Sequence, residues 1–432
     1  MKKSKCIAVM LLATFLLAPK LDYIDTTPVP LLLLCAIALL FGWTNPEANE
    51  RETRTGLSDS LFGTMVFTWT GLCGIATLSA IFNNSFSFEI IAKPIRQVLL
   101  VLTIQWLVRT RVVDATVALA STVVAGTVNS CVLLMQFLGP QYGYSDTILQ
   151  HPGMTNEVIF RKAGLVNGYP IAGLVALFAI GAGFMLFFTS TRKSMYIILF
   201  IPNLVALFLT SRTALLAAAI FLSIVLVQAA SPQLIIVITV AAVAIGILIF
   251  SGVLGDTFSD HSLPFALEFF DTSAGKNGFE AESLTELIAS LGDVPTRVST
   301  WALGNASLNF SDTGKWVDSG YYLWIYQYGL LGSLAIAGIA AALVFPAYQS
   351  LEKKERIVYS GLIAVLLLSH VKGSIIFSRV VGDALVLTSI ALIRRRDNGD
   401  TMPKDLSRLV GVSHRAPPPP SDQKPMSYNR LT

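Results

Sequence analysis

The chain has 432 residues, of which 53% are hydrophobic and only 13% are charged, and its formal net charge at pH 7 is +4. Its mean hydropathy is +0.65. Because so few polar side chains cannot cover a single apolar core, this composition excludes a soluble enzyme, a disordered protein and a secreted disulfide-rich domain.

Apolar runs separated by short polar segments predict about twelve membrane-spanning helices. Twelve crossings of about 20 residues use roughly 240 residues, which agrees with the apolar fraction. Their lengths, and the lack of strict alternation, favour helices over a membrane barrel. The sequence therefore predicts an all-α polytopic bundle. In chain order the spans are expected at 6–19, 28–43, 61–82, 94–108, 112–138, 170–189, 195–210, 213–228, 234–252, 321–345, 357–370 and 380–393.

The positions of Lys and Arg predict the orientation of these spans. Short cytoplasmic loops of membrane proteins are enriched in both residues. Six polar segments agree with one alternating topology, in which both termini are cytoplasmic. Their basic residues are Lys2, Lys3, Lys5, Arg51, Arg54, Arg109, Arg111, Arg192, Lys193, Lys353, Lys354, Arg356, Arg394, Arg395 and Arg396.

One segment on the predicted outer side is much longer than a connector requires. Four units are expected: a transmembrane bundle of about nine spans over 1–252, a large outer loop over 253–320, further transmembrane helices over 321–393 and a disordered cytoplasmic tail over 394–432. Within the acidic outer loop, 281–291 and 295–308 are predicted to be short helices. A shorter outer segment is expected at 139–169.

Several basic residues lie on the predicted outer side, although Lys and Arg are enriched on the cytoplasmic side. Arg212 lies between two spans with almost no loop, where a guanidinium group is costly unless it meets an anion or water. Arg161 precedes a turn with Gly164, Gly168 and Pro170, in which backbone amides can approach a ligand, although the arginine can equally anchor the helix at the interface. We interpret Arg212 as a functional residue and Arg161 as a second candidate.

Aromatic residues accompany the remaining candidates in the outer loop. Arg297 and Trp301 are one helical turn apart, which suits either a structural cation–π pair or an arginine beside a sugar-stacking ring. Asp318 lies where the loop re-enters the membrane, next to the aromatic run that begins at Tyr321. It can cap that helix, as can Ser319, or act as a general base.

A very short outer turn joins the last two predicted spans. His370 and Asp383 are ionisable residues within the membrane region, which makes them functional candidates, and Lys372 and Arg379 lie between them. Several arginines around one outer cavity favour a phosphate or diphosphate ligand. The sequence has no phosphate-binding loop and no metal-binding motif, so neither a metal nor a cofactor is predicted.

Four segments together resemble the O-antigen polymerase and O-antigen ligase superfamily. They are RKAGLVNGYP from Arg161, LTSRTALLAAAIFL around Arg212, RVSTW from Arg297 and DSGYYLWIYQYGLLG from Asp318. The resemblance implies a helical membrane fold related to the glycosyltransferase-C class, with one large periplasmic loop. It also implies metal-independent joining of glycans carried on undecaprenyl diphosphate, at the periplasmic face of a bacterial inner membrane.

Carried onto this chain, the resemblance implies that Arg161, Arg212 and Arg297 hold the lipid diphosphate. Ligases of this superfamily have a histidine where the large loop returns to the membrane, whereas this sequence has Asp318 and Ser319 there. That difference favours a repeat-unit polymerase, with Asp318 and Arg212 as catalytic candidates. The expected partners are lipid-linked glycans, membrane lipid and a chain-length regulator, and not nucleic acid. The alternatives are a ligase and a lipid-linked oligosaccharide flippase or transporter. The candidate residues that bind substrate are Arg161, Arg212, Arg297, Trp301, Tyr321, His370, Lys372 and Arg379.

Overall fold

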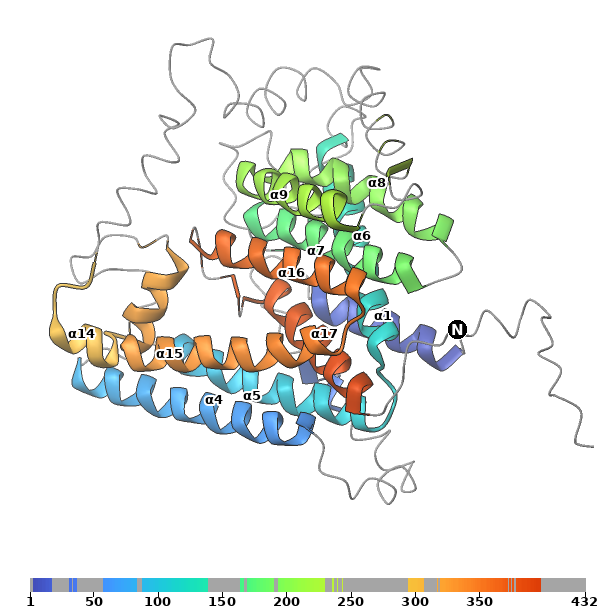
Figure 1. The fold of residues 1–432 in the computed structure, drawn as a ribbon. Helices are drawn as coiled ribbons and strands as arrows, with labels where there is room; N and C mark the ends of the chain where they lie inside the picture. The colour runs from blue at the N-terminus through green and yellow to red at the C-terminus, as the bar shows by residue number, and fades with distance from the viewer. Residues whose placement is uncertain are drawn as a thin grey trace, which may run out of the picture.

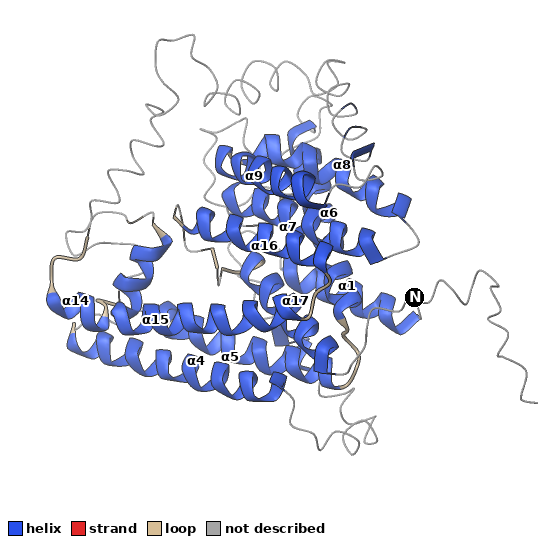
Figure 2. Cartoon of the chain, in the orientation of Figure 1, coloured by secondary structure: helices blue, strands red, loops and turns tan. Residues whose placement is uncertain are grey.

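A computed structural model gives the fold, which is all-helical throughout the part of the chain that it describes (Figure 2). That part comprises residues 3–17, 31–32, 34–36, 57–83, 88–138, 164–166, 169–189, 193–229, 235–236, 239, 243, 294–306, 317, 319–371, 373, 375–376 and 378–397. The helices are α1 (Lys3–Leu17), α4 (Leu57–Phe82), α5 (Phe88–Arg109), α6 (Ala115–Leu138), α7 (Tyr169–Thr189), α8 (Lys193–Thr210), α9 (Arg212–Ala229), α14 (Val298–Leu303), α15 (Gly320–Gln349), α16 (Lys353–His370) and α17 (Val381–Asp397).

The helices agree closely with the predicted spans. Five helices of the described residues are long and apolar enough to cross a membrane, namely α4, α5, α6, α7 and α15, and three shorter apolar helices accompany them. The chain is therefore an all-helical membrane protein. The predicted total of twelve spans is not confirmed, because α16 and α17 are not among these helices and the predicted spans 28–43 and 234–252 lie mostly outside the described residues.

Helix α7 lies at the centre of the bundle. It packs against α6, α8, α9 and α16 (Figure 1), and 89% of its membrane-spanning window is buried by other parts of the protein. In α4 and α15 only 33% of the membrane-spanning window is buried, so most of each helix faces outward. Small residues allow close contact around α7: Gly126 of α6 lies against Ala179, and Gly173 lies against Ala214 of α9. Such contacts are typical of helix packing in membranes, where dispersion forces replace the hydrophobic effect.

Contacts between neighbouring helices show that α7 runs antiparallel to both α6 and α16. Gln136, near the end of α6, hydrogen-bonds to Gly164 just before α7, whereas Gly126 lies deeper, against Ala179. The start of α6 and the end of α7 therefore lie at one end of the bundle. In the same way, Lys354 at the start of α16 lies over the ring of Phe188 near the end of α7.

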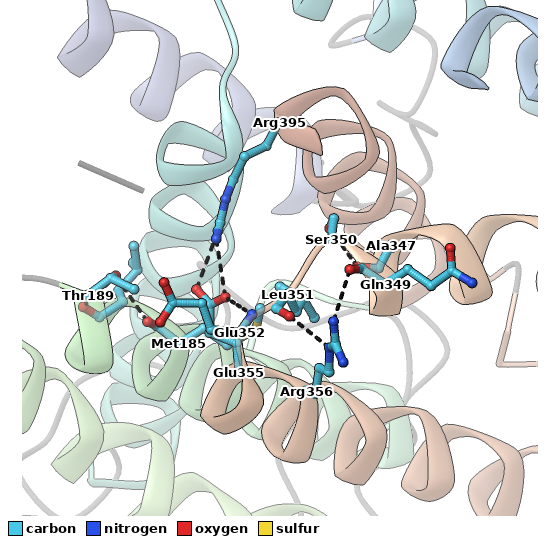
Figure 3. A network of polar contacts seen from close by, with 11 residues as sticks. Met185, Thr189, Ala347, Gln349, Ser350, Leu351, Glu352, Glu355, Arg356 and Arg395 are labelled. Atoms are coloured by element: carbon cyan, nitrogen blue, oxygen red, sulfur yellow. Dashed lines mark hydrogen bonds and ion pairs between the residues drawn. The ribbon is translucent and has the colours of Figure 1, made fainter. Parts of the chain in front are cut away.

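Several of the predicted cytoplasmic basic residues gather at this end, which we call the basic end. Lys5 of α1 forms an ion pair with Asp114, just before α6. Arg395 of α17 pairs with Glu355 of α16 through both carboxylate oxygens, at 3.3 and 3.4 Å (Figure 3). The Glu355 side chain is 1% exposed and also accepts the backbone N–H of Glu352, completing a capping box at the start of α16. The arrangement agrees with the alternating topology that the charges predict.

Helix α15 is broken near its start, which the sequence analysis did not predict. Gly329 has φ +67° and ψ −177°, so residues 320–328 form a separate short helix before the long one. Helix α14 packs against this break: Asn305 N–H donates to Tyr326 O at 2.8 Å, and the Gly329 backbone lies directly against Ala302. The predicted helix at 295–308 is shorter than expected, because Gly304, with φ +77°, ends α14.

Candidate functional site

The end of the bundle opposite the basic end contains α14, and we call it the α14 end (Figure 1). The end of α4 reaches it, since Ser79 and Asn83 both donate side-chain hydrogen bonds to Gly304 O just after α14. The starts of α5, α15 and α17 and the end of α16 also lie there. Tyr328 Oη donates to Ile90 O of α5 at 3.2 Å, so the broken part of α15 joins α14 to the neighbouring helices.

The backbone of Arg212 lies at the same level of the bundle as His370. Helices α7 and α16 are antiparallel, with Phe188 near Lys354 and Gly181 against Leu362. Gly173 is about two helical turns before Gly181 in α7, and His370 is about two turns after Leu362 in α16. Gly173 therefore lies at the level of the end of α16. Gly173 in turn lies against Ala214, two residues after Arg212. The start of α9 thus belongs to the α14 end, as the charge pattern predicts, whereas the Arg212 side chain lies outside the described residues.

His370, the last residue of α16, is fully buried and packs against two aromatic rings of α15. The ring of Trp324 is 4.2 Å from the imidazole, centroid to centroid, and the ring of Tyr321 meets it edge-on at 4.7 Å. Tyr321 Oη donates to Leu367 O, one turn earlier on α16, at 2.9 Å. The structure therefore brings together two candidates, Tyr321 and His370, that are 49 positions apart in the sequence.

Hydrogen bonds from the following turn fix the tautomer of His370. The backbone N–H of Ile375 donates to His370 Nδ1 at 2.9 Å, and that of Ile376 is 3.4 Å away. A nitrogen that accepts an amide proton carries none itself, so the neutral imidazole holds its proton on Nε2. His370 Nε2 is consequently a hydrogen-bond donor in this arrangement, and cannot accept a proton.

Asp383, which the sequence analysis singled out as an ionisable residue in the membrane region, forms an ion pair with Arg96 of α5. The Asp383 side chain is only 1% exposed, and its Oδ2 also lies 3.4 Å from the backbone nitrogen of Val380. Val380 has φ +73°, an unfavourable conformation for a β-branched residue. The start of α17 is thus held by a buried charge pair beside a strained turn, and that turn contains Arg379.

Arg297 and Trp301 lie at α14, against the broken part of α15. Arg297 is the exposed residue immediately before the helix, and its carbonyl accepts the backbone N–H of Trp301. The indole N–H of Trp301 donates to Pro295 O at 2.8 Å, which fixes the ring across the first turn. Trp301 is partly exposed, so the hydrogen bond that holds its ring is compatible with stacking against a sugar.

Three predicted residues, Arg161, Asp318 and Lys372, lie outside the described residues. The structure adds residues that sequence reasoning did not select. Trp324 was part of the aromatic run after Asp318, and its spacing of three from Tyr321 places both on one helical face. Arg96 is the second such residue, because no local pattern in the sequence links it to Asp383, 287 positions away.

These features define an all-helical membrane protein whose candidate site lies at one end of the bundle, where a broken helix meets a buried histidine and several basic residues. Searches against protein-family models and against curated proteins found no match for this chain.

Proposed function

We propose that the protein is a polysaccharide polymerase of the bacterial inner membrane, which joins oligosaccharide repeat units carried on undecaprenyl diphosphate at the periplasmic face. The observation that carries the proposal is the gathering of basic positions at the α14 end: Arg297 before α14, Arg379 before α17 and Arg212 at the first position of α9. Basic side chains at the membrane boundary suit a lipid whose head group is a diphosphate.

In the proposed reaction, a hydroxyl oxygen of one lipid-linked repeat attacks the anomeric carbon of a second lipid-linked glycan. The new C–O bond forms as the bond from the anomeric carbon to the diphosphate oxygen breaks, and undecaprenyl diphosphate leaves with the bonding electrons. Arginines stabilise the negative charge that develops on the leaving group. The proton of the attacking hydroxyl passes to a general base, for which Asp318 is the candidate.

A ligase, which transfers a finished glycan to another acceptor, is the second candidate, and the position of His370 favours it. Ligases of the superfamily that the sequence resembles carry a histidine where the large loop returns to the membrane. Here His370 of α16 packs against Tyr321 at that position. However, its Nδ1 accepts a backbone N–H, so its Nε2 carries a proton and is not a base. The polymerase therefore remains the better-supported proposal.

Glycan lengths in a strain that lacks this gene test the proposal and separate the two candidates. A polymerase predicts that long chains disappear while single repeats are retained on the lipid carrier and on the final acceptor. A ligase predicts that long chains accumulate on undecaprenyl diphosphate. Complementation with the intact gene is the control. An unchanged distribution of chain lengths in the deletion strain would contradict both assignments.

A further inference from the structure

Buried polar atoms without a hydrogen-bond partner cluster where the start of α15, the end of α16 and the start of α17 meet. Among the described residues they are Ser319 Oγ, Ser369 Oγ, His370 Nε2, Ser378 Oγ and Asp383 Oδ1. Ser319, Ser369, His370 and Asp383 are each at most 1% exposed. Buried polar groups in native proteins are almost always paired with protein, ordered water or a ligand, so a cluster of such atoms marks a candidate site for a polar ligand.

Backbone contacts place these five residues, which we call the polar junction, in one region. Gly320, next to Ser319, lies against the carbonyl oxygens of His370 and Gly373. Ile375, whose N–H donates to His370 Nδ1, accepts the N–H of Ser378 at 2.9 Å. Ser378 O in turn accepts the N–H of Gly382, directly before Asp383. A continuous series of contacts therefore runs from α16 through the turn to α17.

The unpaired atoms form a mixed set of donors and acceptors. Three serine hydroxyls can both donate and accept, His370 Nε2 donates, and Asp383 Oδ1 only accepts. A hydroxyl group, which can both donate and accept, suits both kinds of atom. The rings of Tyr321 and Trp324 pack against His370 beside this set. Aromatic surface next to a few polar groups is typical of a ligand site.

We infer that the polar junction binds the hydroxyl groups of a sugar. Given the proposed function, on which this assignment rests, the sugar belongs to the acceptor repeat, because none of the five residues is a lysine or an arginine and Arg96, which contacts Asp383, is already paired with it. The turn at Val380, with φ +73°, lies between Ser378 and Asp383.

Three variants of the full-length protein in lipid nanodiscs test this inference. The probe is the lipid-linked single repeat extracted from the deletion strain. Ser369→Ala removes an unpaired hydroxyl. His370→Asn keeps a side-chain acceptor for the Ile375 amide but removes the Nε2 donor. Ser389→Ala is the matched control, because Ser389 is fully buried and its hydroxyl is already bonded to Tyr359 Oη at 2.7 Å.

We expect Ser369→Ala to leave the Tm unchanged or raised, since no internal hydrogen bond is lost. In both junction variants the KM for the probe should rise about ten-fold, which corresponds to one lost hydrogen bond. Ser389→Ala should lower the Tm and leave KM unchanged. Polymerisation with an unchanged KM in Ser369→Ala and His370→Asn would overturn the sugar site while the polymerase stands. A lowered Tm at constant KM would assign the junction to ordered water.

If the wild-type protein does not polymerise the probe, the proposed function fails, and hydrogen–deuterium exchange of residues 371–383 decides the inference separately. Protection of this segment on adding the lipid-linked repeat, reduced in Ser369→Ala, would still support a sugar site. Equal exchange with and without the repeat would overturn it.

Discussion

Arg96 and Asp383 hold the start of α5 against the start of α17. The carboxylate is 1% exposed and the guanidinium side chain 21%, so the pair is largely removed from solvent. Removing one partner of such a pair leaves an uncompensated buried charge, which costs more than the pair itself contributes. The pair also explains how a carboxylate is tolerated beside the candidate site.

The Arg96 pair gives a prediction at the scale of single residues. Arg96→Met should lower the free energy of unfolding by about 3 kcal/mol, and the double variant Arg96→Met/Asp383→Leu should recover most of that loss. Lys93→Met, on the same helix, breaks an exposed pair with Glu89 at 3.5 Å and should cost less than about 1 kcal/mol. Thermal unfolding in detergent measures all three. A double variant no more stable than Arg96→Met would contradict this account.

At the scale of elements, the break in α15 is what positions α14. Gly329 adopts a positive φ that other residues rarely tolerate, and its backbone lies against Ala302 of α14. The carbonyl of Tyr326, released near the break, accepts Asn305 N–H. Discontinuous membrane helices occur where backbone groups are satisfied by other protein or line a cavity. Here the break places Arg297 and Trp301 next to the start of α15.

Substitution of two different glycines in α15 tests the role of this break. Gly329→Ala introduces a Cβ that meets the carbonyl oxygen of Ala302 and is strained at φ +67°. We expect it to destabilise the protein by about 1–3 kcal/mol and to abolish polymer formation. Gly338→Ala lies in the same helix with no atom within 4 Å of the new Cβ, and should be neutral or stabilising. Equal stability and activity in the two variants would show that the break has no special role.

Across the whole molecule, sequence reasoning predicted the helices well, and it predicted few of the contacts between them. Apolar runs identify membrane helices directly, so the predicted C-terminal ends of α7, α8 and α16 match the structure. Because successive spans cross the membrane in opposite directions, every second loop lies at the same end of the bundle, and the basic residues of those loops gather there. The Lys5–Asp114 ion pair at the basic end is an example. Local patterns therefore carry most of the topology.

The contacts between distant segments could not be predicted in this way. No periodicity indicates that His370 packs against Tyr321 and Trp324, or that Asp383 pairs with Arg96. The break at Gly329 was also missed, because the sequence YQYGLLG reads as one continuous apolar helix and only the packing of α14 requires another conformation. The assignment of the α14 end to the periplasm, and the roles of Arg161, Asp318 and Lys372, remain predictions.

We propose that arginines at the α14 end bind a lipid diphosphate, and an Arg212→Ala variant expressed in the deletion strain shows whether they do. Arg109→Ala, which removes a charge at the basic end of α5, is the matched control. The account predicts that Arg212→Ala abolishes long glycan chains at normal protein level and membrane insertion, whereas Arg109→Ala restores the full ladder. Long chains persisting in Arg212→Ala would contradict the account.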